Sequence, residues 1–247
     1  MNKRYQISIS EVKNFVNHYA TIVTESTRVD YAANNAAIKE HLEKLFRSYE
    51  VNKIVDGERI EDIFFPTETK QRFKVFISHS GKDKDEVEKL ALILQENDIN
   101  CFVDWMVWGN LADLQKIIDD KYCVLKQIKD ENNKTRTTYN YDARNYSTAH
   151  THAMLSMALL EMIDQCDICL FVTSENSTLP GTDFGDVMTL SPWIYEEIKY
   201  MNRISPKAMR EFSEDANRIN ISHPLDLSDF RVVNSRNLIN SINGLYD

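Results

Sequence analysis

A tryptophan and a glutamate stand four residues apart in the segment Ser191-Pro192-Trp193-Ile194-Tyr195-Glu196-Glu197. The pattern from Pro192 to Met201 predicts a helix, and positions four apart on a helix lie on one face, one turn from each other. Glu197 can therefore place a negative charge beside the Trp193 ring. A carboxylate in a pocket bounded by an indole is suited to stabilising a cationic group.

The neighbouring glutamate is a natural comparison for this position. Glu196 points about 100° away from Glu197 around the helix. We expect Glu196 to face solvent or to pair with Lys199 or Lys89.

Further polar side chains follow predicted strands. The β-rich run Phe73–Ser78 leads directly into His79 and Ser80, and the buried run Ile99–Val103 ends at Asp104. The helical spacing of Val87, Leu90, Ala91 and Leu94 lies between them, broken by Asn97-Asp98, so this part of the chain predicts a β-α-β unit.

The same alternation continues toward the C-terminus. A helix is expected around Met154–Ile163, a strand over Ile168–Val172, and another strand over Arg218–Ser222. Strands that alternate with helices predict an α/β fold with a parallel sheet, which places its site at the carboxyl ends of the strands. The loops after Ser78, Asp104 and Thr173 should then build the site.

Residues 1–70 predict an N-terminal helical segment. Ser8 and Glu11 have the spacing of a capping box, and apolar residues then recur at helical spacing from Val12 to Val23. A second such pattern runs from Ile38 to Tyr49. We expect the apolar faces of this pair to support packing or self-association, and residues 71–247 to form one domain with insertions near 115–147 and 177–191.

Composition excludes several classes of protein. Among 247 residues, 29 Lys and Arg stand against 38 Asp and Glu, and the net charge of −9 leaves no broad basic surface for nucleic acid. No signal peptide and no apolar run of membrane-spanning length is present, so we expect a cytoplasmic protein without membrane contact. Cys166 and Cys169 have the C-x-x-C spacing, but Cys169 begins a core strand and no second pair follows, so we expect no metal.

Three motifs resemble those of Toll/interleukin-1 receptor (TIR) domains. Phe76-Ile77-Ser78-His79 is similar to the first TIR motif, and Cys101-Phe102-Val103-Asp104-Trp105 to the second-strand motif before the BB loop. Ser191–Glu197 is similar to the S-x-W-x-x-x-E pattern that carries the catalytic glutamate of enzymatic TIR domains. The resemblance covers about Phe73 to Leu225 and is strongest to stand-alone bacterial TIR proteins, including those of Thoeris-type anti-phage systems.

The resemblance implies a flavodoxin-like TIR fold, self-association through the TIR domain, and an enzyme for which NAD is the substrate rather than a cofactor. The implied activity is that of an NAD+ glycohydrolase or ADP-ribosyl cyclase, which breaks the nicotinamide–ribose bond and makes an ADP-ribose-derived signal for a downstream effector in anti-phage immunity. Glu197 is then the catalytic residue. The residues implied in substrate binding are Trp193, Phe102, His79, Ser80 and Asp104.

Each assignment has a structural alternative. Glu197 can be a solvated helix carboxylate, and Phe102 a core residue of its strand. His79 and Ser80 can cap the following helix, and Asp104 can cap its loop. At the level of function, the alternatives are a non-catalytic TIR interaction module and a nucleoside deoxyribosyltransferase-like enzyme.

Overall fold

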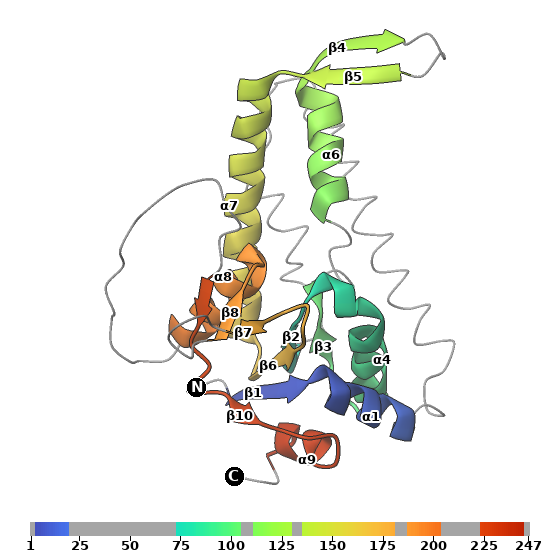
Figure 1. Ribbon diagram of the computed structural model, residues 1–247, viewed down its shortest axis with the longest axis vertical. Helices are drawn as coiled ribbons and strands as arrows, with labels where there is room; N and C mark the ends of the chain where they lie inside the picture. The colour runs from blue at the N-terminus through green and yellow to red at the C-terminus, as the bar shows by residue number, and fades with distance from the viewer. Residues whose placement is uncertain are drawn as a thin grey trace. The chain divides into compact units, whose positions relative to one another are not determined.

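The computed structural model describes residues 3–19, 73–104, 111–129, 135–180, 187–203 and 223–244 (Figure 1). These residues divide between two compact units. Unit 1 comprises Met1–Ala32, Glu68–Val103 and Leu159–Asp247, and unit 2 comprises Ala33–Thr67 and Asp104–Ala158. No helix within the described ranges combines the length and apolar character needed to cross a membrane.

Unit 1 is an α/β structure built on a parallel sheet of five strands in the order β10-β1-β6-β2-β3. The strands are β1 (Lys3–Ser8), β2 (Val75–Ser78), β3 (Cys101–Phe102), β6 (Ile168–Thr173) and β10 (Arg231–Val232). The central strands β2 and β6 are buried almost throughout, as expected where both faces of a parallel sheet are covered.

Helices cover both faces of this sheet. They are α1 (Ile9–Tyr19), the 3₁₀ turn η1 (Gly81–Asp83), α4 (Lys84–Gln95), α8 (Pro192–Arg203) and α9 (Leu238–Ile242). Arg4 of β1 donates to Asn202 of α8, whereas the next residue, Tyr5, donates to the carbonyl of Ser241 in α9. Consecutive side chains of a strand point to opposite faces, so α8 and α9 lie on opposite sides of the sheet.

The N-terminus differs from the sequence expectation, because Lys3–Ser8 form a strand inside the sheet. This strand pairs in parallel with β6 on one side and β10 on the other. Its two charged residues and its glutamine hid the pattern, since Tyr5 and Ile7 alone make only a short alternation. The expected cap is confirmed: the amide of Glu11 donates to Ser8 Oγ at 3.2 Å, and α1 begins directly after Ser8.

Several predicted elements of unit 1 are confirmed. The helix over Val87–Leu94 is α4, and it ends before Asp98, whose φ of 59° is the left-handed conformation common at helix C-termini. The strand over Ile168–Val172 is β6, and the helix from Pro192 is α8. The helix expected over Ile38–Tyr49 and the strand expected over Arg218–Ser222 lie outside the described residues.

The expected insertion near 177–191 contributes to a small antiparallel sheet, in the order β7-β8-β9. Its strands are β7 (Leu179–Pro180), β8 (Val187–Thr189) and β9 (His223–Leu225). This sheet packs against α8. Thr189 accepts the amide of Ser191, which fixes the chain just where α8 begins.

The described part of unit 2 is a helix–hairpin–helix arrangement that spans the expected insertion near 115–147. Its described elements are α6 (Leu111–Tyr122), β4 (Val124–Lys129), β5 (Thr135–Tyr139) and α7 (Tyr141–Gln165), the last of which continues into unit 1 from Leu159. Strands β4 and β5 pair antiparallel as an isolated hairpin.

Candidate functional site

The candidate site lies at the carboxyl edge of the parallel sheet in unit 1, where the loops after β2 and β6 meet. Asp83, at the end of η1, is only 8% exposed and receives two hydrogen bonds from the loop after β6. Ser174 Oγ donates to its Oδ2 at 2.5 Å, and Asn176 Nδ2 donates to its Oδ1 at 2.7 Å. These charge-assisted bonds tie the two loops together.

The loop after β6 is also stabilised from within. Ser177 Oγ accepts the amide of Ser174 at 2.8 Å and donates to the carbonyl of Val172 at 3.1 Å. The polar run that follows Thr173 is therefore a rigid turn rather than a solvated loop. Sequence reasoning did not assign Asp83 this role, although an acidic residue so soon after a strand end was the available signal.

Glu197 is the most unusual side chain at this edge. It projects from α8 and is only 5% exposed, which is rare for a carboxylate. Ser78, the last residue of β2 and 1% exposed, donates its Oγ–H to Glu197 Oε2 at 2.5 Å. The solvated alternative for Glu197 is therefore wrong in this structure, because α8 turns this carboxylate inward onto the end of a central strand.

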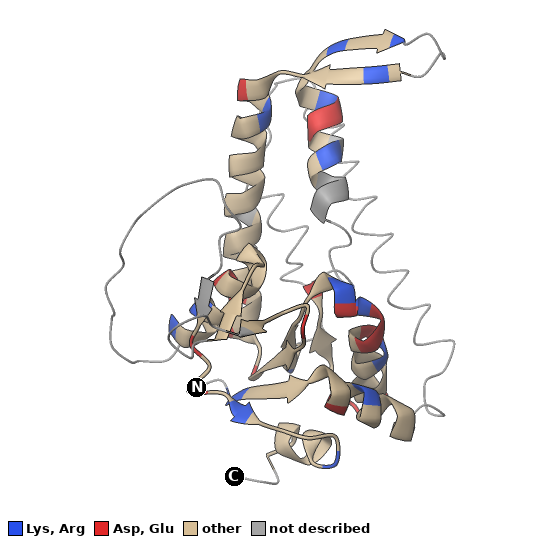
Figure 2. Ribbon diagram, viewed as in Figure 1, with Lys and Arg blue, Asp and Glu red and all other residues tan. Residues whose placement is uncertain are grey.

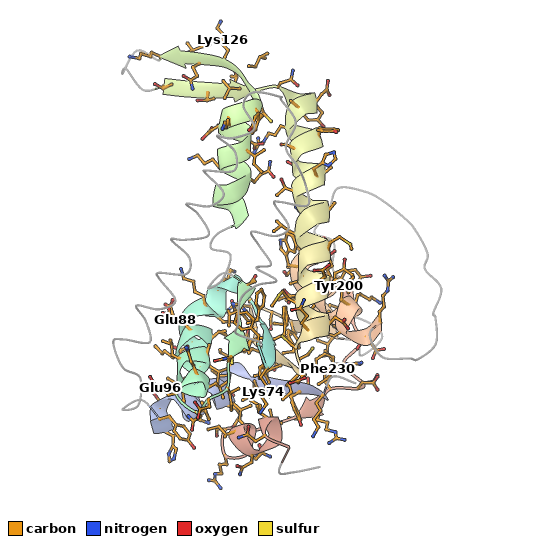
Figure 3. The ribbon with its side chains drawn as sticks, turned by 180° about the vertical axis from the view of Figure 1, so that it is seen from behind. Lys74, Glu88, Glu96, Lys126, Tyr200 and Phe230 are labelled. Carbon is orange, nitrogen blue, oxygen red and sulfur yellow. The ribbon has the colours of Figure 1, made fainter. Side chains whose placement is uncertain are left out.

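Glu196 differs from Glu197 as expected from the helix geometry. It is partly exposed and accepts a hydrogen bond of 2.7 Å from Tyr200 Oη on the next turn of α8. Tyr200 is labelled on this helix in Figure 3. The predicted lysine partners contact other groups: Lys199 lies over the Tyr195 ring, and Lys89 pairs with Glu86.

Trp193 lies one turn before Glu197 on α8 and is partly exposed. The start of this helix is fixed by Ser191, whose Oγ accepts the amide of Ile194 at 3.2 Å, and by Pro192, which has no amide hydrogen to satisfy. The local sequence thus places an accessible indole and a buried carboxylate on one helix at the edge of the sheet.

His79 directly follows β2 and is 8% exposed. Its Nδ1 lies 3.4 Å from the carbonyl oxygen of Ile77, whereas its buried Nε2 has no hydrogen-bond partner among the residues that the structure describes. A buried imidazole nitrogen without a partner is costly unless a ligand or water satisfies it. His79 is therefore able to donate to, or accept from, a bound polar group.

Two other expected site residues have mainly structural surroundings. Ser80 caps η1, since its Oγ accepts the amide of Lys82 at 3.4 Å. Phe102 is completely buried and stacks on Phe76 with ring centroids 5.5 Å apart, with Phe73 against its edge. The structure does not bring the Phe102 ring to an accessible surface.

Asp104 follows β3 by two residues and is partly exposed. It begins the second segment of unit 2, Asp104–Ala158, so only its sequence position just after β3 relates it to the carboxyl edge of the sheet in unit 1.

A buried arginine on β1 contributes to the surroundings of α8. Arg4 is 7% exposed and donates to Asn202 Oδ1 at 3.0 Å, five residues after Glu197 on the same helix. Burial raises the pKa of the Cys169 thiol to about 12, while the Arg4 cation lowers it and the Glu197 carboxylate raises it. Both charges therefore lie close enough to Cys169 of β6 to affect the pKa of its thiol. Arg4 was not among the residues expected near the site, because Lys3–Ser8 were not expected to form a strand.

The described residues offer no evident metal site. Among the described residues, no three His, Cys, Asp or Glu side chains are arranged to hold a metal ion. Cys166 and Cys169 are both buried as free thiols.

No protein-family model, curated protein or solved structure matches this chain.

Proposed function

We propose that the chain is a TIR-type enzyme that cleaves the nicotinamide–ribose bond of NAD, with Glu197 as its catalytic residue. The observation that carries this proposal is the buried Glu197 carboxylate, which is bonded to Ser78 at the carboxyl edge of a parallel sheet. Open α/β sheets bind their ligands at this edge. A carboxylate removed from water interacts more strongly with a nearby positive charge than an exposed one does.

The chemistry suits this arrangement. Breaking the bond expels neutral nicotinamide and leaves a ribosyl group with oxocarbenium character, so the enzyme must chiefly stabilise a developing positive charge. In our proposal Glu197 faces that charge and holds the ribose hydroxyls, while Ser78 fixes the position of the carboxylate. Trp193 bounds the pocket, and His79 Nε2 bonds to a phosphate or ribose oxygen.

The order of the strands supports the TIR assignment. The spatial order β3-β2-β6 corresponds to the 2-1-3 part of the flavodoxin-like order 2-1-3-4-5, if β2 is counted as the first strand. The fourth place is taken by β1, from the N-terminus, and the fifth by β10. As in the stand-alone TIR proteins that the motifs resemble, the ADP-ribose-derived product would signal to a separate effector during phage infection.

The test is the comparison of Glu197→Gln with Glu196→Gln in the full-length protein. Gln keeps the shape of the side chain and removes the charge, so Glu197→Gln should lower NAD cleavage by about a hundredfold or more, the equivalent of about 3 kcal/mol. Glu196→Gln changes the net charge equally but lies on another helical face, and should retain most of the activity. Free nicotinamide and the sugar product are measured by mass spectrometry, with and without phage lysate.

One observation favours the alternative of a non-catalytic interaction module. The Glu197 carboxylate is 5% exposed and bonded to β2, and in this alternative its sole role is to hold α8 on the sheet. In that case both variants lack cleavage to lose, and wild-type protein leaves NAD intact under all conditions. Equal activity loss in both variants would instead move the catalytic role away from Glu197. Release of a free base from a 2′-deoxyribonucleoside, but not from NAD, would favour the deoxyribosyltransferase-like alternative.

A further inference from the structure

One face of α7 in unit 2 is used to hold this unit together. The buried carboxylate of Asp119 on α6 accepts bonds from Arg144 Nε at 2.9 Å and Ser147 Oγ at 3.1 Å, both on α7. Further along the same helix, Thr151 and Leu155 are 3% and 2% exposed. This face of α7 therefore already has its packing partners.

The remaining face carries a stripe of exposed residues without charge. We call it the uncharged stripe; it consists of Tyr146, Ala149, His150, Ala153 and Met157. At about 100° per residue, these five positions fall within an arc of about 100°. The two ends of the stripe, Tyr146 and Met157, are large side chains that are 69% and 52% exposed.

The whole helical segment around the stripe, and not the stripe alone, lacks charged residues. No Asp, Glu, Lys or Arg occurs from Asn145 to Leu160, although 27% of the chain is charged and 16 average residues would contain about four. In Figure 2, the turns of α7 that follow its first charged residues are drawn mostly in tan, the colour of residues other than Lys, Arg, Asp and Glu. A solvated helix face normally carries charged residues, so this surface has the composition of a contact.

Exposed apolar side chains are also concentrated in unit 2. Of the eleven large hydrophobic side chains that are exposed among the described residues, seven belong to this unit. They are Tyr122, Val124, Leu125, Ile128, Tyr141, Tyr146 and Met157. The described part of unit 2 is much smaller than that of unit 1, so this surface is the more apolar of the two.

Charge and spacing together indicate what covers the stripe. Each copy of the chain carries a net charge of −9, so a contact between two copies costs less electrostatic energy where both surfaces lack charge. Four of the five residues of the stripe are separated by 4, 3 and 4 positions, a spacing that is the same in both directions along the helix. They are Tyr146, His150, Ala153 and Met157. A two-fold axis between His150 and Ala153 therefore matches the stripe to itself.

We propose that the uncharged stripe of α7 is a self-association surface that receives the same stripe of a second copy in an antiparallel arrangement. Tyr146 of each copy then lies against Met157 of the other, a sulfur–aromatic contact, and His150 lies against Ala153. The small alanines allow close approach of the two helices. This inference is independent of NAD cleavage.

The size of the stripe sets the strength of association. Its five residues span about 16 Å along the helix, and they expose on the order of a few hundred Å², below the roughly 800 Å² per partner of a standard interface. We therefore expect a dimer with a dissociation constant in the micromolar range.

The experiment is sedimentation velocity of the full-length protein from about 1 to 200 µM, with Tyr146→Glu compared to Tyr141→Glu. Both substitutions replace an exposed tyrosine of α7 by the same charged residue, but the two positions lie about 140° apart around the helix. Tyr146→Glu should raise the dissociation constant about tenfold or more, and Tyr141→Glu should leave it within about twofold. Circular dichroism establishes that both variants are folded.

Mixing charge variants tests the antiparallel arrangement. Tyr146→Glu and Met157→Lys chains are each expected to associate weakly alone, but a mixture forms a heterodimer with one Glu–Lys contact and one native Tyr–Met contact. Wild-type protein that stays monomeric up to 200 µM overturns the proposal. So does equal weakening by Tyr146→Glu and Tyr141→Glu, and absence of heterodimer overturns the antiparallel register.

Discussion

Ser78→Ala isolates the hydrogen bond that holds the Glu197 carboxylate at the edge of the sheet. The substitution removes one oxygen from a site that is 1% exposed and leaves a carboxylate that is 5% exposed with one donor fewer. A hydrogen bond to a charged group contributes about 1.5–3 kcal/mol, so we expect the free energy of unfolding to fall by about 2 kcal/mol. For a chain of this size that corresponds to a melting temperature lower by about 4–8 °C.

The assay is a double-mutant cycle of Ser78→Ala and Glu197→Gln, measured by urea unfolding at pH 7. In the Glu197→Gln background the serine bonds a neutral amide, so Ser78→Ala should cost only about 1 kcal/mol. The cycle should therefore give a coupling energy of about 1 kcal/mol between these two positions. A coupling energy of zero would show that the 2.5 Å contact does not contribute in solution, and the argument that Ser78 positions Glu197 would be refuted.

Two further predictions concern titratable groups away from the Ser78–Glu197 contact. The backbone amide of Ser235 is the main cause of a lowered pKa at Glu11, below its ordinary value of 4.5, so this carboxylate stabilises the fold above that pH and the contribution is lost as pH falls through the lowered pKa. The stability difference between wild type and Glu11→Gln should thus be present at pH 7 and shrink as the pH falls below 4.5; a difference that stays constant with pH would contradict the assignment. Burial raises the pKa of the Cys169 thiol to about 12 and that of Cys101 further, so neither should react with a disulfide reagent at pH 8 until urea unfolds the protein. Rapid labelling of Cys169 or Cys101 in the native protein, located by mass spectrometry, would show that this region of the core opens.

Local pattern was sufficient for much of unit 1. Strand β6 is an apolar run of strand length, and α4 has its apolar residues at helical spacing, so the local sequence alone is enough to predict both elements. The start of α8 follows from Ser191 and Pro192 in the same way, because capping depends on neighbours within one turn.

The sequence also placed Glu196 and Glu197 on different faces of α8. Helix geometry alone separates adjacent residues by about 100°. It does not say which face is covered, and only the packing of α8 on the sheet decided that Glu197 is buried against Ser78 while Glu196 meets Tyr200.

The place of β1 required the tertiary structure. Lys3–Ser8 is too short and too polar to be distinguished from an irregular N-terminus, and its stability as a strand comes from pairing with residues of β6 that lie 165 positions later in the chain. The burial of Arg4 and its bond to α8 follow from that pairing. Long-range strand pairing depends on which edges are free in the folded sheet, and no local pattern in the sequence carries that information.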